Sequence, residues 1–305
     1  MAPCCVFRVP FFITQHAPRN TGWRLTMDEK TINPKDIRES PIAGSWYPGT
    51  KVELERTIDR YLAAVPAQPL PGELVALVAP HAGYVYSGQV AAYAYKQLVG
   101  RHFATVVVIS PSHGPYAGGV LVTRKRYYRT PLGLVEVASD LVQAVDKEFS
   151  LNFIGQDEEH SLEIQLPFLQ RTLGDFRLLP LMLENQFYAT AQGLSQALAT
   201  VLPAEGVLLV ASTDLSHFYT YDQAVQLDRR AMADIGRFDA EGFDRDIASG
   251  RAEACGHGAV VAVLLTAKAR GADKVTVLQY ANSGDVTGDR WRVVGYGAAA
   301  ITKSG

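Results

Sequence analysis

Three short apolar runs, each followed at once by polar residues, dominate the hydrophobic pattern of the chain. They are residues 74–79 (LVALVA), 104–110 (ATVVVIS) and 206–211 (GVLLVA). Their length and their content of branched residues are typical of strands buried on both faces, as in parallel sheets covered by helices. A segment with apolar residues at helical spacing, about 50–65, precedes the first run. The pattern therefore predicts a parallel sheet packed between helices.

Strands and helices alternate along most of the remaining chain. Helices are expected at 87–99, 140–149, 162–173, 189–202, 221–235, 241–248 and 259–269, and further strands at 118–123, 177–183, 275–280 and 293–301. Pro180 lies inside one expected strand, and because proline has no N–H for the ladder it predicts an edge position or a bulge. The alternation predicts an α/β fold: a single domain with a mostly parallel central sheet and helices on both faces.

Composition and charge narrow the class of protein. Residues 1–36 mix apolar residues with prolines without any period, so we expect a poorly ordered extension there and a folded domain at 37–305; Met27 is an alternative start. A net charge of −2 argues against nucleic acid as a partner, and no apolar run is long enough for a membrane. Three cysteines are too few for a disulfide framework, which indicates a reducing, cytoplasmic location.

Three of the seven histidines lie just beyond the three main strands. His81 and His113 follow the first two runs, and His217 ends the segment STDLSH after the third. Ligands bind in the crevice beyond the carboxyl ends of the strands in open α/β sheets. A single histidine there is usually an ordinary hydrogen-bonded loop residue. Three together favour imidazoles that converge on a transition-metal ion.

Other residues with useful chemistry lie near these histidines. Asp214 is three residues before His217, and His160 and Glu163 are three apart at a helix start, so that both can face one way. Cys255 directly precedes an apolar helix, where free N–H groups and the macrodipole lower a thiol pKa and favour the thiolate. Cys255 is therefore either a metal ligand or a buried, inert cysteine.

Several motifs in unbroken order resemble the Memo family, called AmmeMemoRadiSam system protein B in bacteria and archaea. They are AGSWYP (43–48), PHAGYVYSG (80–88), SPSH (110–113), TPLG (130–133), DEEHSLEIQLPF (157–168), STDLSHF (212–218) and a late Cys-Gly (255–256). The resemblance extends from about residue 38 to the end. It implies a fold similar to that of class III extradiol ring-cleaving dioxygenases, which hold iron(II) with two histidines and a carboxylate.

The resemblance also implies a metal site with an unusual ligand. Its metal-binding residues would be His81, His113 and Cys255, with the cysteine in place of the carboxylate. A thiolate makes the ligand set softer, which shifts its preference toward copper or zinc while still allowing iron(II). It also argues against ring cleavage, because a thiolate beside activated oxygen is itself oxidised.

The resemblance also implies roles for the other motif residues, in the pocket that would contain the metal. The resemblance implies that Asp214 and His217 line it, with His217 as the acid–base residue. His160 would lie nearby and orient the substrate or support a ligand, and Glu163 would fix its tautomer.

Three functions are compatible with these features. The leading one is a metal-binding redox protein with an open site for iron(II) or copper and an oxidase or oxygenase activity. By family resemblance it would serve a modification pathway with a radical SAM protein and an Ammecr-type protein as partners. The second is an extradiol-type dioxygenase acting on a small aromatic substrate. The third is a peptide-binding or adaptor module that uses the cleft without catalysis.

Overall fold

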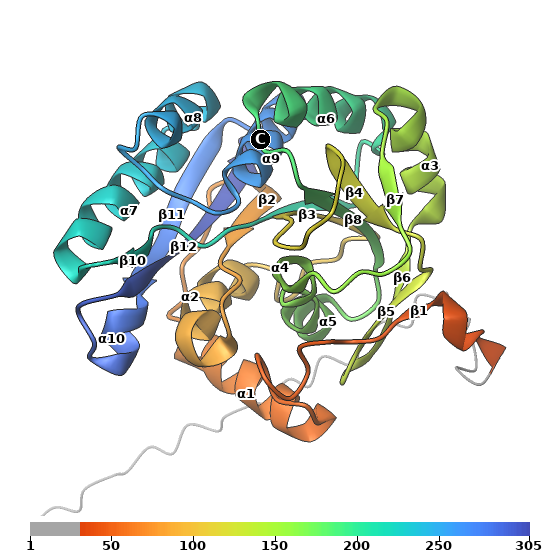
Figure 1. Cartoon of the computed structure of the whole chain (residues 1–305), viewed down its shortest axis with the longest axis horizontal. Helices are drawn as coiled ribbons and strands as arrows, with labels where there is room; N and C mark the ends of the chain where they lie inside the picture. Colours follow the sequence, from red (N-terminus) through yellow and green to blue (C-terminus); the bar gives the residue numbers. More distant parts are fainter. Residues whose placement is uncertain (1–30) are drawn as a thin grey trace, which may run out of the picture. The chain divides into compact units, whose positions relative to one another are not determined.

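A mixed sheet of twelve strands forms the centre of the protein (Figure 1). The structure is a computed structural model that describes residues 31–305, and residues 34–305 form one compact unit. Five neighbouring strands are parallel to one another, in the order β6 (Gly133–Val137), β8 (Arg177–Leu183), β3 (Thr105–Pro111), β9 (Val207–Ser212) and β2 (Glu73–Ala79). The expected extension at 1–36 falls almost entirely on residues 1–30, which lie outside the described part.

The other strands border this parallel centre. Beside β2 lies antiparallel β12 (Val293–Lys303), which pairs with β11 (Lys274–Asn282) and β10 (His217–Tyr219). At the opposite side lie β5 (Tyr127–Thr130), β1 (Ile37–Arg38), β4 (Val120–Thr123) and β7 (Asn152–Ile154). The α/β class and the mostly parallel sheet are therefore confirmed, and antiparallel strands complete the margins.

Helices cover both faces of the sheet. They are α1 (Lys51–Ala64), α2 (Tyr84–Lys96), α3 (Ser139–Glu148), α4 (His160–Glu163), α5 (Leu166–Leu173), α6 (Tyr188–Val201), α7 (Tyr221–Gly236), α8 (Ala240–Ala248), α9 (His257–Ala269) and α10 (Ser283–Thr287). One group comprises α3, α6 and α9, and the other α1, α2 and α5 (Figure 1). Within the described residues, no helix combines the length and the apolar character needed to cross a bilayer.

The helix expected at 162–173 is two helices, α4 and α5. Pro167 lies in the first turn of α5. It has no N–H for a helical bond to the preceding turn, and its ring clashes with the carbonyl four residues earlier. A continuous helix is therefore broken just before it, and proline instead begins the second helix, where its missing N–H costs nothing.

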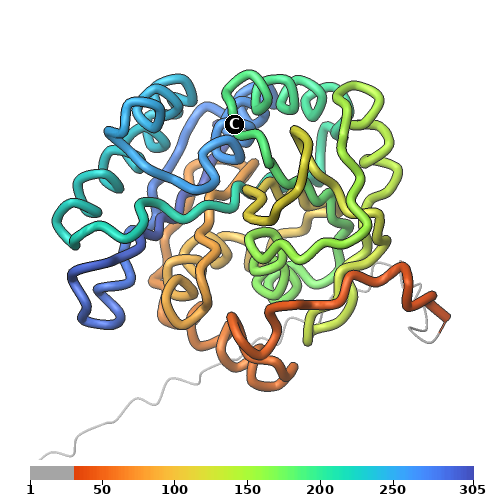
Figure 2. Tube along the Cα trace, in the orientation of Figure 1, coloured from red at the N-terminus to blue at the C-terminus, as the bar shows by residue number. Residues whose placement is uncertain are grey.

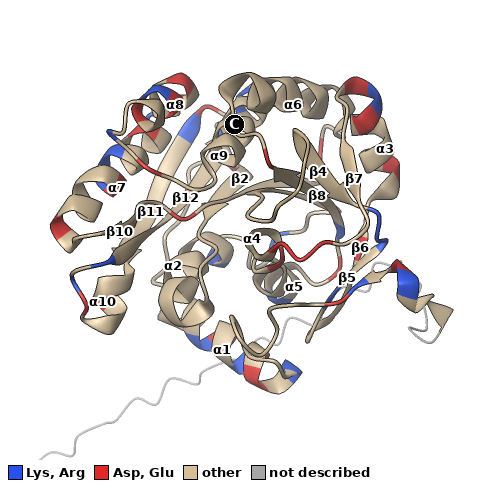
Figure 3. Cartoon of the chain, in the orientation of Figure 1, with Lys and Arg blue, Asp and Glu red and all other residues tan. Residues whose placement is uncertain are grey.

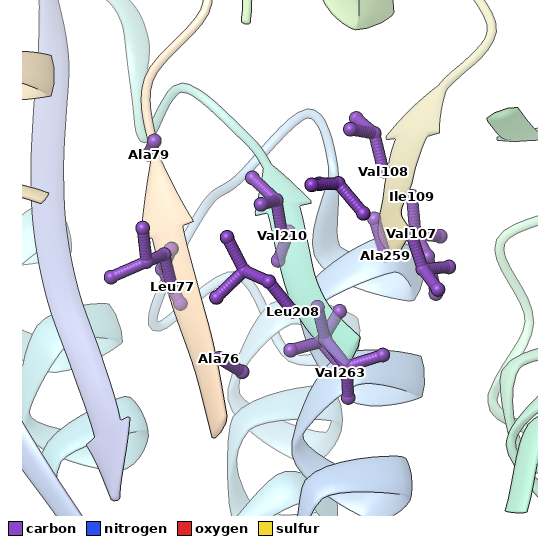
Figure 4. Packing of buried hydrophobic residues seen from close by; sticks show 14 of the residues in the cluster. Ala76, Leu77, Ala79, Val107, Val108, Ile109, Leu208, Val210, Ala259 and Val263 are labelled. Carbon is purple, nitrogen blue, oxygen red and sulfur yellow. The ribbon is translucent and has the colours of Figure 1, made fainter. Parts of the chain in front are cut away.

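The core lies between the central strands and α9. Side chains of β2, β3 and β9 pack against Ala259 and Val263 of α9 (Figure 4). The helix has almost no polar face, and it is buried as its sequence predicted. Charged residues gather instead on peripheral helices such as α7 and α8, and the central strands carry almost none (Figure 3). This rigid centre fixes the strand ends that carry the site.

Strand β8 is internal to the sheet, so the edge position expected for Pro180 is wrong. The strand pairs with β3 along its whole length, but on its other side β6 reaches only Leu178 and β4 begins only at Met182. The carbonyl of Leu178 accepts from Ala138 on that other side. Pro180, two residues further, points the same way and faces the gap between the two neighbours. Its missing N–H therefore leaves no ladder bond unmade.

A buried carboxylate ties α7 to the segment that follows β9. Asp228 accepts hydrogen bonds from the Ser216 N–H and the Tyr280 hydroxyl, both at 2.8 Å. Burial raises the pKa of Asp228 from 3.8 to about 6, against these hydrogen bonds, which lower it. The folded protein therefore retains a proton on Asp228 at a pH where the unfolded chain has lost it.

This retained proton predicts a pH dependence of stability. Its contribution is fully present below the unfolded pKa of 3.8 and is lost as the pH rises through the folded pKa of about 6. Between pH 4 and 7, Asp228→Asn should therefore gain about 3 kcal/mol of unfolding free energy relative to the wild type. Urea unfolding at several pH values measures this. Asp222→Asn, an exposed change on the same helix, should run parallel to the wild type; parallel behaviour of Asp228→Asn would contradict the shift.

Candidate metal centre

Three potential metal ligands meet at the carboxyl edge of the parallel sheet. His81 follows β2, His113 follows β3, and Cys255 lies in the loop before α9. One donor atom of each lies within 4.8 Å of the other two, and the Cys255 Sγ is 3.0 Å from the His81 Nε2. His81 is buried and His113 is exposed. The donors are therefore gathered around a point that is open on the His113 side.

A buried network fixes the tautomer of His81. Ser212 donates its hydroxyl proton to the Ser161 carbonyl at 2.6 Å, and its oxygen lies 3.0 Å from the His81 Nδ1. Because that proton is used, the His81 Nδ1 must be the donor. Gln165 donates from Nε2 to the same hydroxyl oxygen and to the Pro80 carbonyl, which fixes its own orientation. The His81 Nε2 therefore carries no proton, and its lone pair is free beside the cysteine sulfur.

The carboxylate of Glu159 fixes the tautomer of His113 in a similar way. One oxygen of Glu159 lies 3.0 Å from the His113 Nδ1, and the other accepts from the His113 backbone N–H at 2.5 Å. Burial alone would raise the pKa of Glu159, but hydrogen bonds from His113 and Ser161 outweigh it and hold that pKa far below its ordinary value. The ionised carboxylate accepts the Nδ1 proton, so the His113 Nε2 also presents a lone pair.

His160 shares this carboxylate. Its Nδ1 lies 3.2 Å from Glu159, and its ring stacks on that of His113 with centroids 4.6 Å apart. Trp46 covers His160 at 4.3 Å. Burial lowers the pKa of His160 to about 4, so the ring is neutral near pH 7. His160 therefore lies beside the candidate ligands, and its partner is Glu159.

The expected role of Glu163 is wrong. Its carboxylate is fully buried and accepts hydrogen bonds from Arg38, Ser40 and Tyr47, while the carboxylate beside the His160 Nδ1 is that of Glu159. Arg38 is itself buried, and a buried guanidinium needs a carboxylate partner. Glu163 therefore anchors the segment after β1, while Arg38 also donates to the Glu159 carbonyl at 2.7 Å.

Asp214 joins the segments that carry two of the ligands. One carboxylate oxygen accepts from the backbone N–H groups of His81, at 2.8 Å, and Ala82, at 3.3 Å. The Cys255 N–H donates to the Asp214 carbonyl at 3.2 Å, and the Asp214 N–H points at the sulfur at 3.3 Å. Burial raises the pKa of Asp214 to about 7. Its second oxygen is 4.0 Å from the His81 Nε2, so Asp214 lies beside this candidate ligand.

The local geometry around Cys255 depends on a glycine. A Cβ at Gly256 would lie 2.3 Å from the Ser212 carbonyl oxygen, so only glycine permits this close approach. Gln186 donates to the Cys255 carbonyl at 2.6 Å and accepts from the Gly258 N–H at 3.0 Å. The backbone on both sides of the sulfur is therefore fixed.

The expected effect of the helix start on the thiol is wrong. Burial raises the pKa of Cys255 far above its ordinary value, with the nearby Asp214 carboxyl adding to the increase. Loss of water around a charged sulfur thus outweighs the hydrogen bonds and the helix dipole. In the absence of a cation beside it, Cys255 is a neutral thiol.

His217 lies outside the cluster of three donors. Its N–H donates to Glu253 at 3.0 Å, and its Nδ1 is 3.7 Å from the same carboxylate oxygen. Burial lowers the pKa of His217, and the ring is near enough to His113 for their charges to interact. It is therefore a neutral imidazole near His113.

Sequence reasoning missed four residues that hold the ligands in place. They are Glu159, Gln165, Gln186 and Ser212. Three of them lie inside the motifs that carried the family resemblance, next to residues that were singled out. Glu159 directly precedes His160, and this adjacency was the one available signal; the partners of the others come from distant parts of the chain.

Comparison with known proteins identifies the family. A family model described as Memo-like protein matches residues 38–300. The chain belongs to the Memo family. MEMO1 family proteins of Nitrosopumilus maritimus, Methanothermobacter thermautotrophicus and Methanosarcina mazei are 34%, 36% and 35% identical to it. The matches cover 86%, 85% and 87% of this chain and 98%, 98% and 99% of the relatives. A solved structure of an uncharacterized Escherichia coli K12 protein covers 74% of the chain at 15% identity and a TM-score of 0.48.

The Memo-family match includes every part of the candidate metal centre. Residues 38–300 contain His81, His113 and Cys255 as well as the carboxylates that surround them. The match begins at Arg38, the residue whose side chain reaches Glu163. The resemblance indicated by the motifs is thereby confirmed.

The buried pair of Arg38 and Glu163 predicts a large effect on stability. Glu163→Ala should lower the unfolding free energy by about 3 kcal/mol, because it leaves the buried guanidinium with only Asp157, 3.6 Å away, as a carboxylate partner and removes the acceptor of the Ser40 and Tyr47 hydroxyls. Chemical denaturation measures this, and Glu158→Ala, an exposed change in the same segment, should be nearly neutral. A Glu163→Ala variant as stable as the wild type would contradict the anchoring role.

Proposed function

We propose that this Memo-family protein holds a transition-metal ion, iron(II) or copper, at His81, His113 and Cys255 and uses it for redox chemistry on a small substrate. The observation that carries the proposal is the convergence of the three donor atoms within 4.8 Å. Two imidazoles and a thiolate leave one or more coordination positions open, as reactive metal sites require.

The donor set fits such an ion in its chemistry. Both histidines have their Nδ1 proton engaged, by Ser212 and by Glu159, so each offers an Nε2 lone pair before any metal arrives. The Cys255 thiol must lose its proton on binding, which makes binding favourable only for a cation that stabilises a thiolate. The softness of this set supports copper, while zinc is a further candidate and iron(II) remains compatible.

The residues around the three ligands would position them, transfer protons and shape the approach of the substrate. A bound ion would supply electron transfer or activation of a substrate at its open position. Asp214 positions His81 and Cys255 through backbone hydrogen bonds. His217, which is neutral and lies near His113, is the residue that we assign to proton transfer. Trp46 and His160 form a wall that shapes the approach of a substrate.

The proposed setting is a cytoplasmic modification pathway. Family membership supports a radical SAM protein and an Ammecr-type protein as partners, each acting before or after this protein on a common substrate. A reducing compartment suits a site that depends on a free thiol, because Cys255 must escape disulfide formation and oxidation.

Removal of a ligand should abolish metal binding. The wild type, loaded anaerobically with iron(II), copper(I) or zinc and dialysed, is expected to retain about one ion per chain, and Cys255→Ser, His81→Ala or His113→Ala less than about a tenth of that. Elemental analysis with far-UV circular dichroism separates ligand loss from unfolding.

Two controls accompany the metal-binding experiment: one tests the other cysteines, and one tests for ring cleavage. Replacement of Cys4 and Cys5 by serine should leave the metal content unchanged. Retention of a full ion by Cys255→Ser would overturn the proposed site. Ring cleavage of catechols by the iron(II)-loaded wild type, lost in His217→Ala, would replace the redox proposal with an extradiol-type dioxygenase.

The tautomer of His81 should matter for affinity. Ser212→Ala removes the acceptor of the Nδ1 proton, so metal affinity should fall by about 10–100-fold although every ligand remains. Ser216→Ala is the matched control, because Ser216 is fully buried on the same segment, as Ser212 is, but it faces Asp228 and not a histidine of the site. Competition with a chelator measures both variants. Equal affinities in the two would contradict a role for Ser212 in fixing the ring.

A further inference from the structure

A groove of about 520 Å³ lies along one face of α7. It is lined by Tyr219, Gln223, Gln226, Leu227, Arg230 and Arg251. Four of these residues recur on α7 at helical spacing, whereas one belongs to β10 and one to the connection between α8 and α9. None of them takes part in the proposed metal site.

Two chain segments connect the groove to the metal centre. They are the segment that follows β9 and the segment that precedes α9, and both can be followed in Figure 2. At the metal centre the Cys255 N–H donates to the Asp214 carbonyl, and further along the His217 N–H donates to Glu253. The same two segments then supply the groove with Tyr219 and an arginine. Two short stretches of chain therefore join the groove to the metal centre.

Two guanidinium groups dominate the polar chemistry of the groove. Arg230 and Arg251 both donate to Asp246, and Arg230 is also 3.8 Å from Asp234. A guanidinium has five N–H donors, and among the described residues Asp246 is the only hydrogen-bond acceptor of either group. About half of each arginine side chain is exposed. Asp246 therefore holds both guanidinium groups in place, and each group has further N–H donors that could bind a ligand.

Buried carboxylates hold the guanidinium groups at the groove. Arg230, Arg237 and Arg251 pair with Asp234 and Asp246, which are themselves buried, and a further carboxylate, Glu253, bonds the Tyr219 hydroxyl. Guanidinium groups positioned by carboxylates are the usual means of binding carboxylate or phosphate oxygens. The arrangement resembles a fixed pair of donors more than a solvated surface ion pair.

We propose that this groove binds the oxyanion group, a carboxylate or a phosphate, of a small organic molecule, with Arg230 and Arg251 as its donors. The Gln226 amide adds a neutral polar contact, and Tyr219 and Leu227 provide an apolar surface for the body of the molecule. The assignment does not depend on the metal. A ligand in the groove would contact Tyr219 and Arg251, which belong to the two segments that lead to Asp214 and Cys255.

Calorimetric titration of the chelator-treated, full-length protein tests the proposal. The probes are phenylacetate, inorganic phosphate and the neutral amide phenylacetamide. At least one oxyanion is expected to bind, and the amide is not. Binding of phenylacetate alone identifies a carboxylate on an apolar body, whereas equal or tighter binding of phosphate identifies a phosphate site.

Paired variants locate the binding. Gln226→Glu places a negative charge in the groove without touching the ion pairs and should weaken binding by about tenfold or more. Gln196→Glu, an exposed change on α6, should not. Arg251→Gln should weaken binding similarly, and Arg229→Gln, outside the groove on α7, should leave it unchanged.

Three results would overturn the proposal. They are the absence of binding by any oxyanion, equal binding of the amide, and equal weakening by Gln226→Glu and Gln196→Glu. Because the protein carries no metal in this experiment, such a failure leaves the proposed metal centre untouched.

Discussion

The candidate site depends on the hydrogen bonds that Asp214 makes to two distant parts of the backbone. Its carboxylate holds the start of the loop after β2, and its carbonyl holds the loop before α9. Without this bridge, no hydrogen bond of Asp214 would join the His81 loop to the Cys255 loop, although Ser212 and Gln186 would still hold each loop separately. The bridge is possible because β2 and β9 are paired and parallel, so that their carboxyl ends reach the same edge.

Glu159 has the corresponding role on the other side of the site. A single carboxylate orients two stacked imidazoles, His113 and His160, and takes two backbone N–H groups as well. Such a heavily bonded carboxylate stays ionised although it is buried. Ser212 and Glu159 thus hold the two candidate histidine ligands, His81 and His113, in fixed orientations. The rings need little rearrangement when an ion binds, and such preorganisation favours tight and selective binding.

Much of this arrangement could be predicted from the sequence, because buried strands and the residues beyond them are local signals. The runs ending near His81 and His113 predicted both the strands and their common edge. The partners of those histidines were harder to predict, because Ser212 is 131 residues from His81 and is itself held by Gln165. The same holds for Glu163, which pairs with Arg38 at a separation of 125 residues. Pro180 shows the same limit, because a gap between two neighbouring strands is a property of the sheet and cannot be seen in one strand.

Gly256 has a consequence for how this family can diversify its chemistry. The backbone there packs directly against the Ser212 carbonyl, which leaves no room to move the loop. The direction from which residue 255 approaches the histidines is therefore set by the main chain. The atom that it presents is set only by its side chain. Exchange of sulfur for oxygen at this single position would turn a soft ligand set into a hard one while the scaffold stays the same.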